Sequence, residues 1–196
     1  MSRPGVPGLE LGADNGAQEV VSRMDPDKAA VHEELERVRQ VFARHIDDMT
    51  PGALDRISDG TRWTNRQLLF HMLFGYIIVR RLIWMVKLLS YLPAAATKPF
   101  AALLNAATRP FNWANYIGPV FAARIISPAR MQHWLRGLTV WLEKDLNRQN
   151  AKGLTRGMYY PTKWDPYFKR YMTLADLYRY PTQHFDHHDR QLSAPQ

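Results

Sequence analysis

The amino-acid sequence predicts an all-α protein, a four-helix bundle with an apolar insert between its second and third helices. Four long segments place apolar residues three and four positions apart, and no segment shows the alternating pattern that is typical of strands. A length of 196 residues with 46% hydrophobic composition suits one domain with a sizeable core. We therefore expect one helical bundle over residues 25–192, after a disordered tail over 1–24 that is rich in glycine and proline.

The first two helices have recognisable starts. Asp25 and the proline after it are typical of an N-cap and a first turn, which predicts a helix over about 26–49. Thr64 and Gln67 match the pattern of a capping box, which predicts a second helix over roughly 64–92.

The second helix is apolar enough to raise the question of a membrane span. Residues 68–92 have the necessary length, but Arg80 and Arg81 lie at the centre of the segment. Each arginine would cost about 2.5–3.5 kcal/mol at the middle of a bilayer. We therefore reject a transmembrane helix.

The insert over 93–127 is apolar, aromatic and basic. Pro99, Pro110 and Pro119 each suit the first turn of a helix, which predicts that the insert breaks into short helical pieces at these positions. So many apolar residues are unusual for a solvated loop. They favour a cap on the bundle or a homodimer face, a lid over an apolar substrate, or a patch at an anionic membrane surface. In the last case Lys98, Arg109 and Arg124 would meet lipid phosphates.

The third helix follows the insert, and a loop punctuated by prolines separates it from the fourth. A helix is predicted over about 128–150, and residues 158–172 form an aromatic loop without a clear period. Thr173 and Asp176 match another capping box and begin the last helix. Pro181 lies inside that helix, where it removes a backbone hydrogen bond and should kink the helix or make it restart.

Histidines on two helices form the candidate site. Residues four apart lie on one helix face, so His184 and His188 can point at the same spot, a common way to hold a divalent metal. His71 lies on the buried stripe of the second helix and is the best candidate for a third ligand. Gly75, one turn later, would leave room for a metal, water or substrate. The alternative is that each histidine is a hydrogen-bonded core or surface residue.

Four polar neighbours of the pair have open roles. Asp186, His187 and Asp189 should point away from the ligand face, as partners of the ligands or as solvated groups. Gln191, one turn beyond His188, could donate or accept a hydrogen bond with a ligand or simply pack between helices.

Two short stretches of the sequence, "GTRWTNRQLLFHML" and, far downstream, "HFDHHDRQL", stand out together. They resemble the motifs of the DinB/YfiT-like superfamily of metal-binding four-helix bundles. In that family a Trp followed by Thr or Ser opens the second helix and leads to a histidine, and the last helix carries HxxHHxxQ. "GTRWTNRQLLFHML" matches the first motif and "HFDHHDRQL" the second. The matching residues are Trp63, Thr64, Leu69 and His71, then His184, His187, His188 and Gln191. The resemblance covers residues from about 26 to 192.

The resemblance implies a metal and a reaction class. A divalent ion, typically zinc or nickel, would be bound at the positions of His71, His184 and His188, with water or substrate completing the shell. Several members are thiol-dependent S-transferases or isomerases that use bacillithiol, mycothiol or glutathione, and mycothiol-dependent maleylpyruvate isomerase is related. The predicted function is therefore a divalent-metal-dependent enzyme of this type acting on a small molecule. The alternative is a non-catalytic metal-binding protein at a membrane surface or in an assembly.

Composition adds constraints on chemistry and partners. The chain has no cysteine, so a metal must be held by nitrogen and oxygen ligands and a thiol must come from a cofactor. The net charge is +8, and ten Lys and Arg residues but no acidic residue lie between Asp59 and Glu143. This favours an anionic partner, unless acidic residues elsewhere fold over the stretch. No helix has a one-sided basic stripe, so we do not expect nucleic-acid binding. We expect a cytoplasmic protein, or one peripheral to the membrane.

Overall fold

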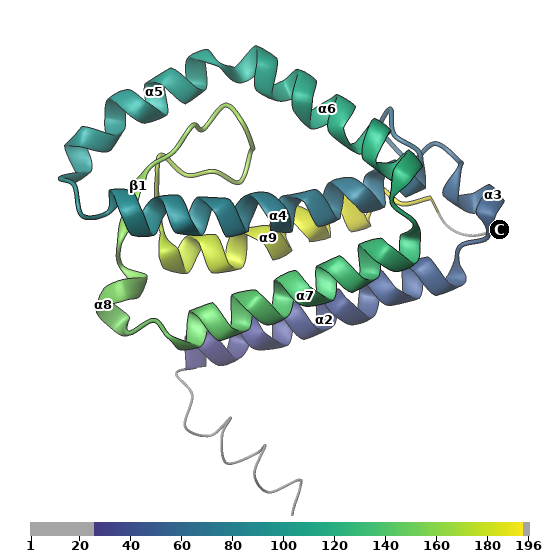
Figure 1. The fold of residues 1–196 in the computed structure, drawn as a ribbon, viewed down its shortest axis with the longest axis horizontal. Helices are drawn as coiled ribbons and strands as arrows, with labels where there is room; N and C mark the ends of the chain where they lie inside the picture. Colours follow the sequence, from purple (N-terminus) through teal and green to yellow (C-terminus); the bar gives the residue numbers. More distant parts are fainter. Residues whose placement is uncertain (1–25, 194–196) are drawn as a thin grey trace, which may run out of the picture.

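A computed structural model describes residues 26–193. Four of its helices form a bundle around one core (Figure 1). The predicted disordered tail over 1–24 lies outside the described residues. Helix α4 packs beside α9 and α7 beside α2, while α4 also contacts α7 and α2 contacts α9. The prediction of an all-α fold with four long bundle helices is confirmed. These helices are α2 (Pro26–Asp48), α4 (Asn65–Leu89), α7 (Pro128–Asn147) and α9 (Leu174–Asp189).

The core is built from the apolar stripes that define the helices in the sequence. Leu35, Val38 and Phe42 of α2 are fully buried, as are the stripe of α4 and both Leu177 and Phe185 of α9. Each large apolar side chain buried in this way stabilises the fold by about 1.5–3 kcal/mol. Packing of these stripes holds α4 against α9.

Both predicted capping boxes are present. The Thr64 hydroxyl accepts from the Gln67 N–H, and the Gln67 side chain accepts from the Thr64 N–H at 3.1 Å. Thr173 and Asp176 make the same exchange at the start of α9. Of the two outcomes predicted for Pro181, a kink or a restart of the helix, the restart is wrong, because α9 continues through the proline. Pro181 is buried, and its packing compensates for the single backbone hydrogen bond that it removes.

The insert over 93–127 forms two helices that arch over α4 (Figure 1). After η1 (Ala94–Thr97), α5 spans Lys98–Ala106 and α6 spans Thr108–Ile125. The predicted break at Pro119 is wrong, because α6 is continuous through it. Pro119 is buried, so contacts on its ring offset the lost hydrogen bond. Among the described residues, no helix combines the length and the hydropathy needed to cross a bilayer.

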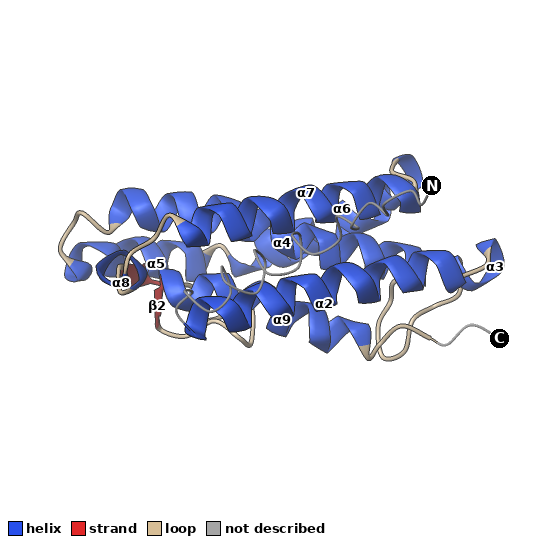
Figure 2. Cartoon of the chain, turned by 90° about the horizontal axis from the view of Figure 1, so that it is seen from below, coloured by secondary structure: helices blue, strands red, loops and turns tan. Residues whose placement is uncertain are grey.

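A short antiparallel hairpin was not predicted. Strands β1 (Gly157–Tyr159) and β2 (Tyr171–Thr173) pair within the segment that the sequence indicates to be a loop, at one end of the bundle (Figures 1 and 2). Three residues per strand are too few for a visible alternation. The connecting residues 160–170 lie between the arch and α4. Two further one-turn helices, α3 (Pro51–Leu54) and α8 (Ala151–Leu154), complete the described elements.

The end of α9 is tied to the start of α4. The buried side chain of Asn65 donates to Ala53 O and to Ser193 Oγ, both at 2.9 Å, and its Oδ1 accepts from the Ser193 N–H. The Asp59 N–H donates to Gln191 O at 2.7 Å. These bonds fix the residues directly after α9 to the start of α4 and to the segment before it, and so hold the end of α9 that carries the histidine motif in place.

Candidate metal centre

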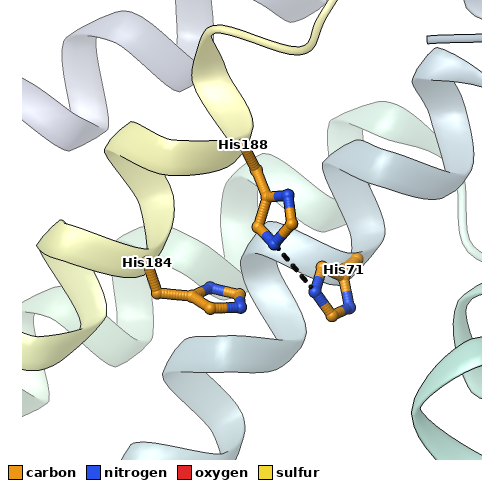
Figure 3. Close-up of side chains that lie close together, drawn as sticks. All are labelled: His71, His184 and His188. Carbon is orange, nitrogen blue, oxygen red and sulfur yellow. Dashed lines mark hydrogen bonds between the residues drawn. The ribbon is translucent and has the colours of Figure 1, made fainter. Parts of the chain in front are cut away.

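Three histidines converge where α4 and α9 lie side by side (Figure 3). His71 comes from α4, and His184 and His188 come from α9. One ring nitrogen from each lies within 4.8 Å of the other two. The Nε2 atoms of His71 and His188 are 3.1 Å apart. Among the described residues, no other group of three or more His, Asp or Glu side chains approaches this closely. The structure therefore brings together the three residues predicted as ligands.

Gly75 allows this approach, in a different way from the one predicted. A Cβ atom at Gly75 would lie 2.9 Å from Nδ1 of His184 and 3.3 Å from its Cε1. The space next to the glycine is therefore filled by the His184 ring and is not left for water or substrate. The missing side chain on α4 lets a ring from α9 enter the interface.

Burial keeps the three imidazoles neutral. His71 and His184 are buried and His188 is half-buried. Removal from water is the main cause that lowers the pKa of His71 well below its usual value and that of His184 to about 3. The neighbouring imidazoles lower both values further. Burial also lowers the pKa of His188 to about 4. Neutral imidazole is the form that offers a lone pair to a metal.

The hydrogen bonds of the rings fit a shared cation. Nδ1 of His188 is 2.7 Å from Oε1 of Gln191, and because a carbonyl oxygen only accepts, Nδ1 carries the proton. The lone pair of Nε2 then points toward His71. Nδ1 of His71 and Nδ1 of His184 are buried without a hydrogen-bond partner. Each such unsatisfied atom costs about 1–3 kcal/mol. Because Nε2 of His71 is the atom that faces His188, a shared cation would bind that nitrogen and not Nδ1.

The distances also suit a metal. Two nitrogens bound to one tetrahedral zinc at about 2.0–2.1 Å lie roughly 3.3 Å apart. The 3.1 Å separation of His71 and His188 is close to this value, whereas the 4.8 Å limit for the set requires a small inward shift of the third ring. The three residues therefore fit a divalent ion with two preformed ligands and one close by.

The acidic neighbours of the histidines point elsewhere. Asp186 binds Arg37 of α2 through both carboxylate oxygens at 2.9 Å, and Asp189 binds His45 of the same helix at 2.5 Å. His187 contacts the ring of Tyr167 edge-on, with ring centroids 5.9 Å apart. Asp186 and Asp189 thus fasten α9 to α2, and none of the three residues joins the cluster.

Sequence comparison assigns the chain to a family. A family model of the DinB superfamily matches residues 34–192. The chain belongs to the DinB superfamily. A solved structure with the same fold is YfiT from Bacillus subtilis, described as a probable metal-dependent hydrolase with an unusual four-helix bundle topology. The two share 17% sequence identity over 87% of each chain, with a TM-score of 0.59. A comparison with curated proteins found no match.

Trp63, part of the first DinB motif, holds the ring of His71. The two rings stack with centroids 4.4 Å apart and an angle of 29° between their planes. Nε1 of Trp63 donates to Tyr116 O at 3.2 Å, so the tryptophan also connects the site to α6. Of the second motif, Gln191 hydrogen-bonds a histidine of the cluster, His188, which is the first of the two roles considered for it.

The sequence reasoning missed Asp165, in the hairpin loop. Its Oδ2 lies 3.8 Å from Nε2 of His184, while the carboxylate accepts from the Tyr180 hydroxyl at 2.9 Å and from the Tyr167 N–H at 2.8 Å. Burial raises the pKa of this carboxyl group. One signal was available, because Asp165 is the only acidic residue between Asp145 and Asp176 and has aromatic neighbours.

A narrow apolar pocket lies beside His71 and His184. Its free volume is about 50 Å³, enough for a few water molecules. Its walls come from α4, α5, α6, the hairpin loop and α9, and most of its lining is apolar and aromatic. Phe111 and Trp164 both line it, and their rings stack on one another with centroids 4.0 Å apart. A larger cavity of about 430 Å³ between α2, α8 and α9 contains none of the three histidines, so we associate the smaller pocket with the site.

Proposed function

We propose that this DinB-superfamily protein is a divalent-metal-dependent enzyme that acts on a small, mostly apolar molecule. The observation that carries the proposal is the convergence of three neutral imidazoles, from two helices, beside an apolar pocket. Three protein ligands leave a position open, which is typical of catalytic metal sites. Zinc and nickel both suit imidazole ligands.

Each neighbouring residue has a role in this proposal. A bound divalent ion would act as a Lewis acid that lowers the pKa of a thiol or a water. Gln191 fixes the tautomer of His188, and Trp63 orients His71. Asp165 is the half-buried carboxylate placed to accept a proton from a molecule beside His184. The arch and the hairpin loop exclude bulk water.

The proposed reaction is transfer or isomerisation with a low-molecular-weight thiol such as mycothiol. The chain contains no cysteine, so a thiol nucleophile must come from a cofactor. The family resemblance supports this class, and a cytoplasmic location would suit it, because thiols are kept reduced there. Hydrolysis is the second candidate. It is favoured by Asp165, which could take a proton from water, and by the description of YfiT as a probable hydrolase.

The first experiment is metal analysis of protein purified without an affinity tag. We expect stoichiometric zinc or nickel in the wild type and its loss in His188→Ala. His133→Ala is the matched control, because His133 is exposed on α7, away from the cluster. A wild type that stays free of metal after incubation with either ion would contradict the proposal.

A second experiment separates the two reaction classes. Cobalt-loaded protein is titrated with mycothiol and, separately, with glutathione, and the absorption spectrum is recorded. A thiolate-to-metal charge-transfer band supports the thiol reaction. Loading with metal but no spectral change on adding either thiol would favour hydrolysis.

A further inference from the structure

The outer surface of the arch, which we define as α5 and α6 (residues 98–125), is apolar and cationic. Of the twelve large hydrophobic side chains that are exposed among the described residues, five lie on the arch. Four of them are on α6 alone, and Trp113, at 68%, is among the most exposed. The four are Trp113, Tyr116, Phe121 and Ile125. An exposed group of this size on one helix indicates a binding surface.

Within the described chain, only the inner face of α6 is packed against other elements. Phe111 and Asn115 lie on the inner face and line the pocket beside the histidines. Arg109, Trp113 and Arg124 recur at helical spacing on the opposite face and are exposed. The packing of the bundle therefore accounts for the inner face and leaves the outer face without a partner among the described residues.

The charges on the arch are of one sign. No acidic residue lies between Asp59 and Glu143, and within the described chain the ion pairs of this stretch involve only Arg66 and Lys87. Neither residue is on the arch. Arg124 instead places its guanidinium over the ring of Phe121, 5.8 Å from the centroid. Within the described chain, acidic residues therefore do not neutralise the arginines of the arch. The interpretation that acidic residues from elsewhere fold over the acid-free stretch does not hold for the arch.

We propose that the outer surface of the arch binds membranes that contain anionic phospholipids. Tryptophan and tyrosine prefer the interface between lipid and water, and arginines at the same level bind lipid phosphates. A second copy of the chain fits less well, because a symmetric contact would place arginines opposite arginines with no carboxylate between them. Nucleic acid also fits less well, because large apolar side chains separate Arg109 from Arg124.

The expected loss of vesicle binding follows from the charges and the side chain that each variant removes. Each arginine near an anionic surface contributes about fivefold to the partition coefficient, so Arg109→Gln/Arg124→Gln should weaken binding roughly 25-fold. Removal of one large interfacial side chain in Trp113→Ala should weaken binding by about tenfold. The binding of the wild type should also fall as salt is raised.

The test is sedimentation of the full chain with vesicles. One set contains phosphatidylcholine alone and the other also contains phosphatidylserine. The charge control is Arg148→Gln/Lys152→Gln, which removes the same charge from exposed positions at the opposite end of α7 and on α8. The aromatic control is Trp134→Ala, an exposed tryptophan on α7. Circular dichroism spectra verify that every variant is folded.

We expect sedimentation with the phosphatidylserine vesicles only, strong losses in the two arch variants, and wild-type binding in both controls. Equal losses in the arch variants and their controls would mean that net charge alone is responsible, and would overturn the proposal. So would a wild type that ignores both kinds of vesicle. A dimer in analytical ultracentrifugation that Trp113→Ala dissociates would assign the surface to a second copy instead. Retention of an RNA or DNA duplex without vesicle binding would assign it to nucleic acid.

Discussion

The substitution Gly75→Ala tests how closely the two helices must approach for the histidines to meet. The new Cβ would lie 2.9 Å from Nδ1 of His184, where ordinary contacts are 3.4–4 Å. The ring must therefore move by at least about half an ångström, more than the tolerance of roughly 0.2 Å for a metal-ligand bond. Loss of one well-placed ligand should weaken metal binding by about 100-fold. Alanine favours the helix by about 1 kcal/mol, so the metal-free protein should stay folded.

The affinity is measured by competition with a chromophoric chelator, and stability by thermal unfolding of the metal-free protein. Gly137→Ala on α7 is the matched control, because a Cβ there meets nothing within 4 Å. It should bind metal like the wild type and gain about 0.5–1 kcal/mol of stability. Unchanged metal affinity in Gly75→Ala would refute the reasoning, because the ring of His184 would then not need the space that the glycine leaves.

Three further predictions follow from contacts of the described residues. Gln191→Ala removes the acceptor for Nδ1–H of His188 and should weaken metal binding about 10–100-fold in the same chelator assay. The free energy of unfolding of the metal-free protein should fall as pH drops from about 6.5 toward 4, because the pKa values of His184 (about 3) and His188 (about 4) lie below their usual value and the unfolded chain takes up protons first. Urea unfolding across this range should show a slope of up to about 1.4 kcal/mol per pH unit for each histidine, and a flat profile would contradict the buried, neutral cluster. Asp145→Asn should destabilise the bundle by about 3 kcal/mol in urea unfolding without changing metal affinity, because the buried carboxylate binds Lys87 at 2.6 Å.

The bundle could be predicted because its signals are local. Thr64 and Thr173 cap their helices through side chains only three residues away, and the apolar stripes repeat within each helix. The same periodicity placed His71 on the buried face of α4. His184 and His188 could be paired because a separation of four residues fixes their relative direction whatever the rest of the chain does.

The features that were predicted wrongly or missed depend on contacts between segments that are distant in the sequence. Asp165 reaches His184 only because the hairpin loop folds back between the arch and α4. The sequence rule for proline counts the lost hydrogen bond but not the packing that offsets it at Pro119 and Pro181. The space beside Gly75 was predicted, but it holds the His184 ring and not a metal, water or substrate. How far this ring enters depends on how closely α4 and α9 pack, which the sequence does not specify.

The stack of Phe111 on Trp164 joins two segments that both lie outside the four bundle helices. Nε1 of Trp164 adds one more bond between them, to Leu104 O at 2.8 Å. Because neither Phe111 nor Trp164 belongs to a bundle helix, their stack can separate while the four bundle helices stay packed. The residence time of a molecule beside the histidines would then be set by how often the two aromatic rings separate, and replacing Trp164 by a smaller residue would shorten it.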